Sequence, residues 1–151
     1  MSRLPWALLV VASLLWSLDS AAIASGPAVY AAGEVPSGGA SAEFTFSLDD
    51  ATPAAFDFWQ YPPSGPRNIS LTGVQEARCL GAMFGGQTFS LRGTAMDSSS
   101  GESVSLLLFL VDGGSNGPDR FSLKVSRSSG EVFLFVPMRD ILAGDIIVGC
   151  T

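Results

Sequence analysis

Apolar and polar residues alternate along most of the chain from residue 42 onward. Phe44, Phe46 and Leu48 alternate with polar residues, as in a strand that buries one face and exposes the other. Further apolar runs are separated by Gly, Ser, Asp and Pro, the residues that form turns. These runs are 56–61, 69–74, 88–95, 104–111, 121–126, 132–136 and 145–148. The pattern predicts an all-β antiparallel fold of about seven to eight short strands.

The spacing of the turns favours a β-sandwich, with a small β-barrel as the alternative. Residues 88–136 should form a four-stranded meander, in which 104–111 is apolar on both faces and should be covered on both. The length fits one domain. We place that domain at 41–151, preceded by an irregular arm at 25–40 that is rich in Ala, Gly and Pro.

The first residues have the features of a secretory signal peptide, which we assign to 1–24. A short basic start precedes an apolar core at 8–18, and small residues follow at Ala22 and Ala24. Cleavage is expected after Ala24, with Ala22 as the alternative. The apolar core is shorter than the roughly 20 residues of a membrane span. We therefore expect a secreted protein, extracellular or periplasmic, with no membrane span after cleavage.

Two cysteines, Cys79 and Cys150, follow this leader. In an oxidising compartment two cysteines are expected to form a disulfide, and this is our prediction. Two free thiols are the alternative. A zinc site is a poorer fit, because the chain has no histidine to complete the usual ligand set.

The charge and the missing histidine exclude several classes of function. The net charge is −6 and the basic residues are scattered, so nucleic-acid binding is not expected. Without histidine, Ser-His-Asp and Cys-His catalysis and histidine-ligated metal centres are ruled out. Glycoside hydrolysis by two carboxylates remains, but no spacing selects a pair. The acids available for it are Asp49, Asp50, Asp57, Glu102 and Glu131.

A candidate ligand-binding face lies on the strand at 56–61. Asp57, Trp59 and Tyr61 share one side of it and could form a platform on which a sugar ring stacks, with Gln60 nearby to hydrogen-bond. The competing expectation is that Trp59 packs over the end of the sandwich, because a large aromatic side chain usually buries its surface. We favour packing.

A candidate calcium site lies in the glycine-rich loop at 112–119. Asp112, Asn116 and Asp119 offer the oxygen ligands that calcium prefers, although their spacing matches no complete calcium motif. Asp, Asn and Gly are also what an ordinary turn requires, and this is the favoured interpretation. No other cofactor is expected.

Several of these segments, taken in order over residues 33–136, resemble a known family. The segments are Gly38-Gly39-Ala40, Phe44-Thr45-Phe46, the strand at Trp59, Phe89-Ser90-Leu91-Arg92-Gly93-Thr94-Ala95 and Leu110-Val111-Asp112-Gly113-Gly114-Ser115-Asn116-Gly117-Pro118-Asp119-Arg120-Phe121-Ser122-Leu123-Lys124-Val125. Together they resemble the exported bacterial domains called post-COAP. The resemblance implies an extracellular β domain without an established activity. It also implies that the sequon at Asn68 is unmodified. The cysteine pair and the lack of histidine near Trp59 depart from the family pattern.

The sequence therefore predicts an exported, non-catalytic domain with a structural or binding role at the cell surface or in the extracellular space. The sequence does not identify a partner; the candidates are a surface polysaccharide and another exported protein. The alternatives are a carbohydrate-binding module that uses the aromatic strand face and a small secreted carboxylate-dependent hydrolase. A hydrolase should have a cleft with converging acids and a raised pKa. A binding module should expose Trp59 and Tyr61, whereas a structural domain should bury them.

Overall fold

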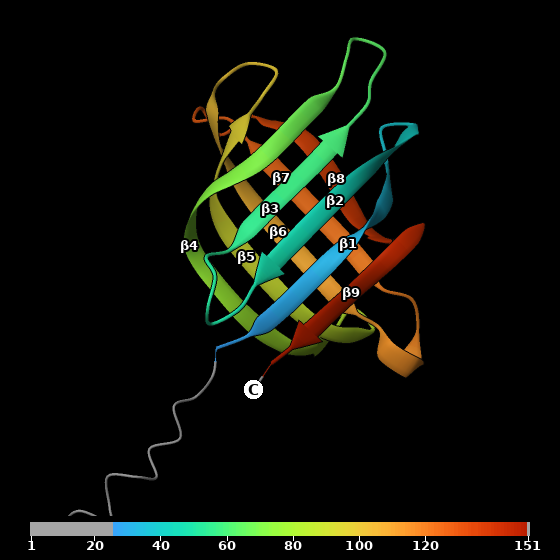
Figure 1. The fold of residues 1–151 in the computed structure, drawn as a ribbon. Helices are drawn as coiled ribbons and strands as arrows, with labels where there is room; N and C mark the ends of the chain where they lie inside the picture. The colour runs from blue at the N-terminus through green and yellow to red at the C-terminus, as the bar shows by residue number, and fades with distance from the viewer. Residues whose placement is uncertain (1–25, 151) are drawn as a thin grey trace, which may run out of the picture.

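The computed structural model describes residues 26–150, which form nine strands in a single antiparallel sheet (Figure 1). The predicted signal peptide lies outside the described residues. Along the sheet the order is β8-β7-β6-β5-β4-β3-β2-β1-β9. The strands are β1 (Ala28–Ser37), β2 (Ala40–Leu48), β3 (Ala55–Gln60), β4 (Arg67–Met83), β5 (Gly86–Asp97), β6 (Ser103–Asp112), β7 (Arg120–Ser126), β8 (Val132–Asp140) and β9 (Ala143–Gly149). Between 26 and 150 the only helical turn is the 3-10 turn η1 (Gly114–Asn116), and no helix there is long and apolar enough to cross a membrane.

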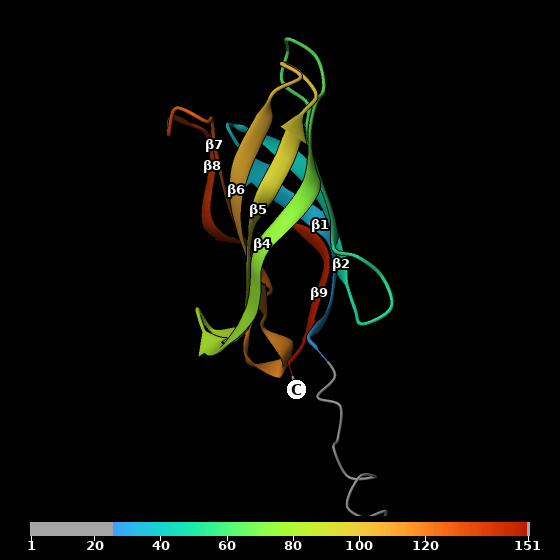
Figure 2. The same ribbon diagram turned by 90° about the vertical axis from the view of Figure 1, so that its left-hand side faces the viewer.

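The sheet curls on itself into a half-barrel. In Figure 1 strands β9, β1, β2 and β3 form a front layer, and β5 to β8 cross behind it. Figure 2 shows β4 bending at the side between the two layers. The all-β antiparallel prediction is confirmed. The structure nevertheless has one continuous sheet of nine strands, nearer the barrel alternative than two separate sheets of seven or eight. The reason is β4, which is hydrogen-bonded to both β3 and β5 and is bent by three register shifts in its pairing with β5.

The core lies between the two layers and is built largely from phenylalanine. Phe44 and Phe58 of the front layer stack on Phe121 of β7, with ring centroids 4.4 and 6.0 Å from its own. Phe46 packs on Phe89 of β5, with centroids 5.4 Å apart. All five side chains are buried, and each points to the face that the alternation predicts. Aromatic pairs of this kind contribute about 0.5–1.5 kcal/mol each beyond the area they bury.

Residues 28–37, expected to lie in an irregular arm, form β1 instead. This strand is hydrogen-bonded to β2 on one side and to β9 on the other. Val29, Ala31 and Val35 alternate into the core, so packing outweighs the weak strand preference of Ala and Gly. Gly38 and Gly39 have φ values of 59° and 81° and make the two-residue hairpin turn into β2. The domain therefore begins before residue 41.

The meander at 88–136 and the final strand before Cys150 are both present, as β5 to β8 and as β9. The central strand β6 differs from its prediction in one respect. Leu106, Leu108 and Leu110 are buried against the front layer, but Leu107 and Phe109 on the other face are only half-buried. Within residues 26–150 no second layer covers that face, and the side chains of adjacent strands shield it only partly.

Cys79 and Cys150 form the expected disulfide, with Cα atoms 6.0 Å apart and a sequence separation of 71. It joins β4 to the residue that follows β9, and so ties the bend of the sheet to its last strand. A disulfide is compatible with an oxidising, exported location.

Candidate functional site

Strand β3 carries the predicted aromatic face on the outside of the front layer. Phe56 and Phe58 are buried in the core, so Asp57 and Trp59 point outward. Trp59 is 41% exposed, and Tyr61, which follows the strand, is 53% exposed. The expectation that Trp59 packs over the end of the fold is therefore wrong. Its side of the sheet faces solvent, because both layers use their inner faces for the core.

Neighbouring strands place polar side chains on both sides of the exposed tryptophan. Glu43 of β2 and Asn68 of β4 are the residues directly opposite Trp59. The Tyr61 hydroxyl donates a hydrogen bond to Glu43 Oε2 at 3.1 Å, and this bond raises the pKa of Tyr61. Asn68 Nδ2 donates to Asp57 Oδ1 at 3.2 Å. We call these five residues the aromatic site: Glu43, Asp57, Trp59, Tyr61 and Asn68.

The aromatic site combines two flat rings with carboxylate and amide groups on an open sheet surface. This is the composition of a site that stacks a ring and fixes its orientation by hydrogen bonds. The sequence places Asp57, Trp59 and Tyr61 together because they alternate along one segment. It does not reveal Glu43 and Asn68, since their places depend on the strand registers.

The predicted calcium ligands Asp112 and Asp119 lie together, but they bind backbone N–H groups. Asp112 Oδ1 accepts from Gly114 N at 2.9 Å, and its Oδ2 accepts from Val148 N at 3.2 Å. Asp119 Oδ1 accepts from Gly113 N at 2.9 Å, and its Oδ2 accepts from Ile146 N at 2.7 Å. All four oxygens are therefore engaged within the fold.

These two aspartates supply β9 with hydrogen-bond acceptors that a further strand would otherwise provide. Strand β9 is the last in the sheet, and Ile146 and Val148 have their N–H groups on the edge away from β1. The carboxylates satisfy those groups and hold the loop between β6 and β7 against β9. Asn116 lies in η1, where its backbone N–H donates to Gly113 O. Within residues 26–150 no group of three or more acidic or Cys side chains is arranged to hold a metal.

Each of the acids available for hydrolysis is engaged in a hydrogen bond or an ion pair within the fold. The pKa of Asp49 is lowered to about 2, mainly by the hydroxyls of Tyr30 and Thr52. Asp49 and Asp50 line a shallow hollow of about 370 Å³, but an acid with so low a pKa stays ionised and cannot donate a proton at neutral pH. Glu102 and Glu131 both form ion pairs with Arg127.

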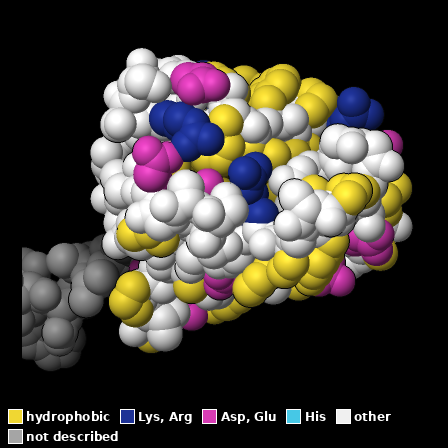
Figure 3. Space-filling model, turned by 90° about the horizontal axis from the view of Figure 1, so that it is seen from above, with side chains coloured by type: hydrophobic (Ala, Val, Ile, Leu, Met, Phe, Trp, Pro, Cys, Tyr) yellow, Lys and Arg dark blue, Asp and Glu magenta, His cyan; other side chains and the backbone are white. Residues whose placement is uncertain are grey.

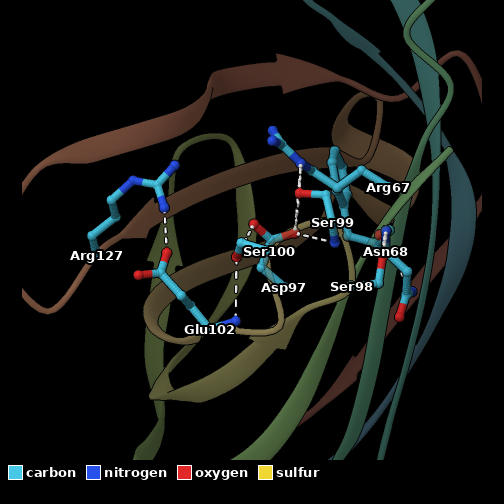
Figure 4. Close-up of polar contacts among 9 residues, drawn as sticks. Arg67, Asn68, Asp97, Ser98, Ser99, Ser100, Glu102 and Arg127 are labelled. Atoms are coloured by element: carbon cyan, nitrogen blue, oxygen red, sulfur yellow. Dashed lines mark hydrogen bonds and ion pairs between the residues drawn. The ribbon is translucent and has the colours of Figure 1, made fainter. Parts of the chain in front are cut away.

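A buried aspartate organises one end of the half-barrel (Figure 4). Asp97 is fully buried, and burial by itself would raise its pKa. Hydrogen bonds from Ser99 and Ser100 and the charge of Arg67 outweigh burial, so the pKa of Asp97 is lowered. Arg67 Nε lies 3.6 Å from Asp97 Oδ1. The cluster fixes the turn between β5 and β6, and the sequence analysis missed it.

Two guanidinium groups lie over one ring at the same end. The Cζ atoms of Arg67 and Arg127 lie 5.4 and 4.6 Å from the ring centre of Phe133. Because Arg67 is on β4 and Phe133 is on β8, the contact between them links strands that are not neighbours in the sheet. Arg67 also contacts Asp97 and Ser99, and Arg127 also pairs with Glu102. Both guanidinium groups are therefore engaged within the fold, which indicates a structural role for this end.

Comparisons with protein-family models, curated proteins and solved structures gave no match to this chain. The resemblance to post-COAP domains stays a prediction.

Proposed function

We propose that this protein is an exported, non-catalytic domain that binds a surface polysaccharide through the aromatic site. The observation that carries the proposal is the exposure of Trp59 and Tyr61, side by side on the outside of the front layer. A large aromatic side chain that is exposed leaves apolar surface in contact with water. Such side chains commonly contribute most of the binding energy at interaction surfaces.

The polar neighbours support the same function. Glu43 fixes the Tyr61 ring by accepting a hydrogen bond from its hydroxyl, so the ring loses little further freedom when a ligand binds. Asp57 and Asn68 are joined to each other and lie beside Trp59, where hydroxyl groups of a stacked sugar could bond with them. The lowered carboxyl pKa values at Asp49 and Asp97 favour binding over acid-catalysed hydrolysis.

The test is retention of residues 25–151 on a panel of insoluble polysaccharides and cell walls, compared with Trp59→Ala. Phe135→Ala is the matched control, because Phe135 is 60% exposed on β8, a strand that does not pair with β3. We expect the wild type and Phe135→Ala to be retained and Trp59→Ala to be lost, with all three folded by circular dichroism. Failure of the wild type to bind any polymer would overturn the proposal.

A further inference from the structure

The basic side chains of the described residues are confined to one part of the sheet, whereas acids occur throughout it. Every Lys and Arg from 26 to 150 lies in β4 to β8 or in the turns between them. The front strands β9, β1, β2 and β3 are adjacent in the sheet and carry acids without a single base. Those acids are Glu34, Glu43, Asp57 and Asp145. In Figure 3, an end-on view, the dark blue side chains lie in the centre and upper part with magenta beside them, and the lower edge shows yellow and magenta without dark blue.

Two of these acids are placed against each other next to the tryptophan. Glu34 of β1 and Glu43 of β2 are direct cross-strand partners, and both point outward because Val35 and Phe44 beside them are buried. Like charges directly opposite each other destabilise a sheet. Glu43 is in turn opposite Trp59, so the unfavourable pair and the exposed ring occupy one row across β1, β2 and β3.

We infer that the ligand of the aromatic site carries positive charge, as a polysaccharide of deacetylated amino sugars does. The inference rests on the proposed function and adds the ligand class to it. A protonated amine near Glu43 would relieve its repulsion with Glu34. The face of a tryptophan ring also attracts cations. A polymer of uronic acids is negatively charged, and the front strands offer it no Lys or Arg with which to form an ion pair.

The geometry favours a glycan over a basic peptide segment. Strand β3 is hydrogen-bonded to β2 on one side and to β4 on the other, so its backbone offers no free edge to which an extended peptide could add. What remains accessible at β3 is a flat surface of rings and carboxylates. A flat surface of this kind suits stacking by a pyranose ring with an amino group at its edge.

The test uses three insoluble polymers with a β-1,4-linked pyranose backbone: cellulose, chitin and chitosan, the last cross-linked so that it stays insoluble when its amines are protonated. Only chitosan carries free amines. We expect the folded chain from 25 to 151 to bind chitosan most strongly below the pKa of the sugar amine, and to bind it less at higher pH and higher salt. Trp59→Ala should weaken binding by about tenfold or more. Glu43→Gln, which keeps an acceptor for Tyr61, should weaken it by about two- to fivefold.

The control is Asp145→Asn, which removes one charge from the same layer at a strand that does not touch β3. It should reduce binding less than Glu43→Gln. Equal effects of the two variants would mean a diffuse electrostatic attraction and would overturn the inference.

The other outcomes separate the inference from the proposed function. Equal retention on cellulose, chitin and chitosan, lost in Trp59→Ala, would leave the sugar-binding function intact and overturn the cationic ligand. No retention on any of the three, or on the wider panel, would overturn both. Displacement by oligolysine as effective as by chitosan oligosaccharides, and insensitive to Trp59→Ala, would instead identify a surface for basic proteins.

Discussion

Replacing Asp119 by alanine should weaken the contact between β9 and the loop that joins β6 to β7. We call this contact the seam of the half-barrel. The substitution leaves two backbone donors without an acceptor: Gly113 N–H in the loop and Ile146 N–H on β9. Both residues are buried, so water cannot easily replace the carboxylate. Asp119→Asn keeps one oxygen and should lose only one of the two bonds.

The magnitude follows from the type of bond. A hydrogen bond to a charged group contributes about 1.5–3 kcal/mol, and two of them are lost in Asp119→Ala. Because Asp119 itself is only half-buried, partial solvation reduces the sum, and we expect a loss of about 3 kcal/mol in the free energy of unfolding. Asp119→Asn should lose about half as much. A loss of about 3 kcal/mol corresponds to a fall in Tm of roughly 10 °C for a domain of this size.

The assay is denaturant unfolding of the three proteins, with amide hydrogen exchange at Ile146 and Val148 read by NMR. Exchange at Ile146 should accelerate more than the global loss of stability explains, because the β9 edge opens locally. Asp145→Asn is the matched control on the same strand. Its side chain faces solvent, and its effect should stay within about 0.5 kcal/mol. If Asp119→Ala changed stability by no more than this control, the assigned closure of the seam would be wrong.

Three further predictions concern the disulfide, the buried aspartate and the calcium site. The double variant Cys79→Ser, Cys150→Ser removes the cross-link between residues that are 71 positions apart in the sequence. It should lower the free energy of unfolding by roughly 4 kcal/mol, measured by denaturation. An effect below about 1 kcal/mol would mean that the other contacts already close the sheet. The lowered pKa of Asp97 means that its ionised form stabilises the fold above the unfolded pKa of about 3.9, and that this stability is lost as pH falls through the folded value. Asp97→Asn should therefore flatten the fall of stability below about pH 4, and an unchanged pH profile would contradict the assignment. Calcium should leave Tm unchanged, because the fold already engages Asp112 and Asp119; a rise in Tm that Asp112→Asn removes would establish the metal site instead.

Strand faces were predictable because their signal is local. The alternation around Phe44, Phe46, Phe89 and Leu91 assigns each side chain to the core, and all four are buried. A period of two residues needs no knowledge of the partner strand. The same reasoning placed Asp57 and Trp59 together on the opposite face of β3.

One strand escaped prediction and another was predicted too short, for different reasons. β1 is composed of Ala, Gly and Pro as much as of strand-forming residues, and it is stabilised by pairing with both β2 and β9. β4 is longer than its alternation suggests. Register shifts between Leu71 and Gly73, between Val74 and Glu76, and after Cys79 each interrupt the period of two.

The role of the aspartate loop was open in the sequence because its partners are distant. Asp119 and Asp112 bind backbone groups that lie 27 and 36 residues further along the chain. Asp and Gly residues suit a cation, a turn or an edge of a sheet equally well, and only the closed fold distinguishes these uses. Whether the outer face at Trp59 is covered is likewise a property of the whole sheet, which the alternation along β3 does not contain.

The polar residues that break local rules fall into two groups, and the difference between the groups bears on function. Asp112 and Asp119 bring charge to a half-buried seam, but each oxygen meets a backbone donor, so their presence is explained by the fold itself. Glu34 and Trp59 have no side-chain hydrogen-bond partner within the described residues, and Glu34 faces a like charge across the strand pair. Stability alone does not account for that arrangement. Natural sequences accept such local conflicts mainly at functional sites, so this row is where a ligand that supplies positive charge and a stacking surface would complete the interactions that the fold leaves open.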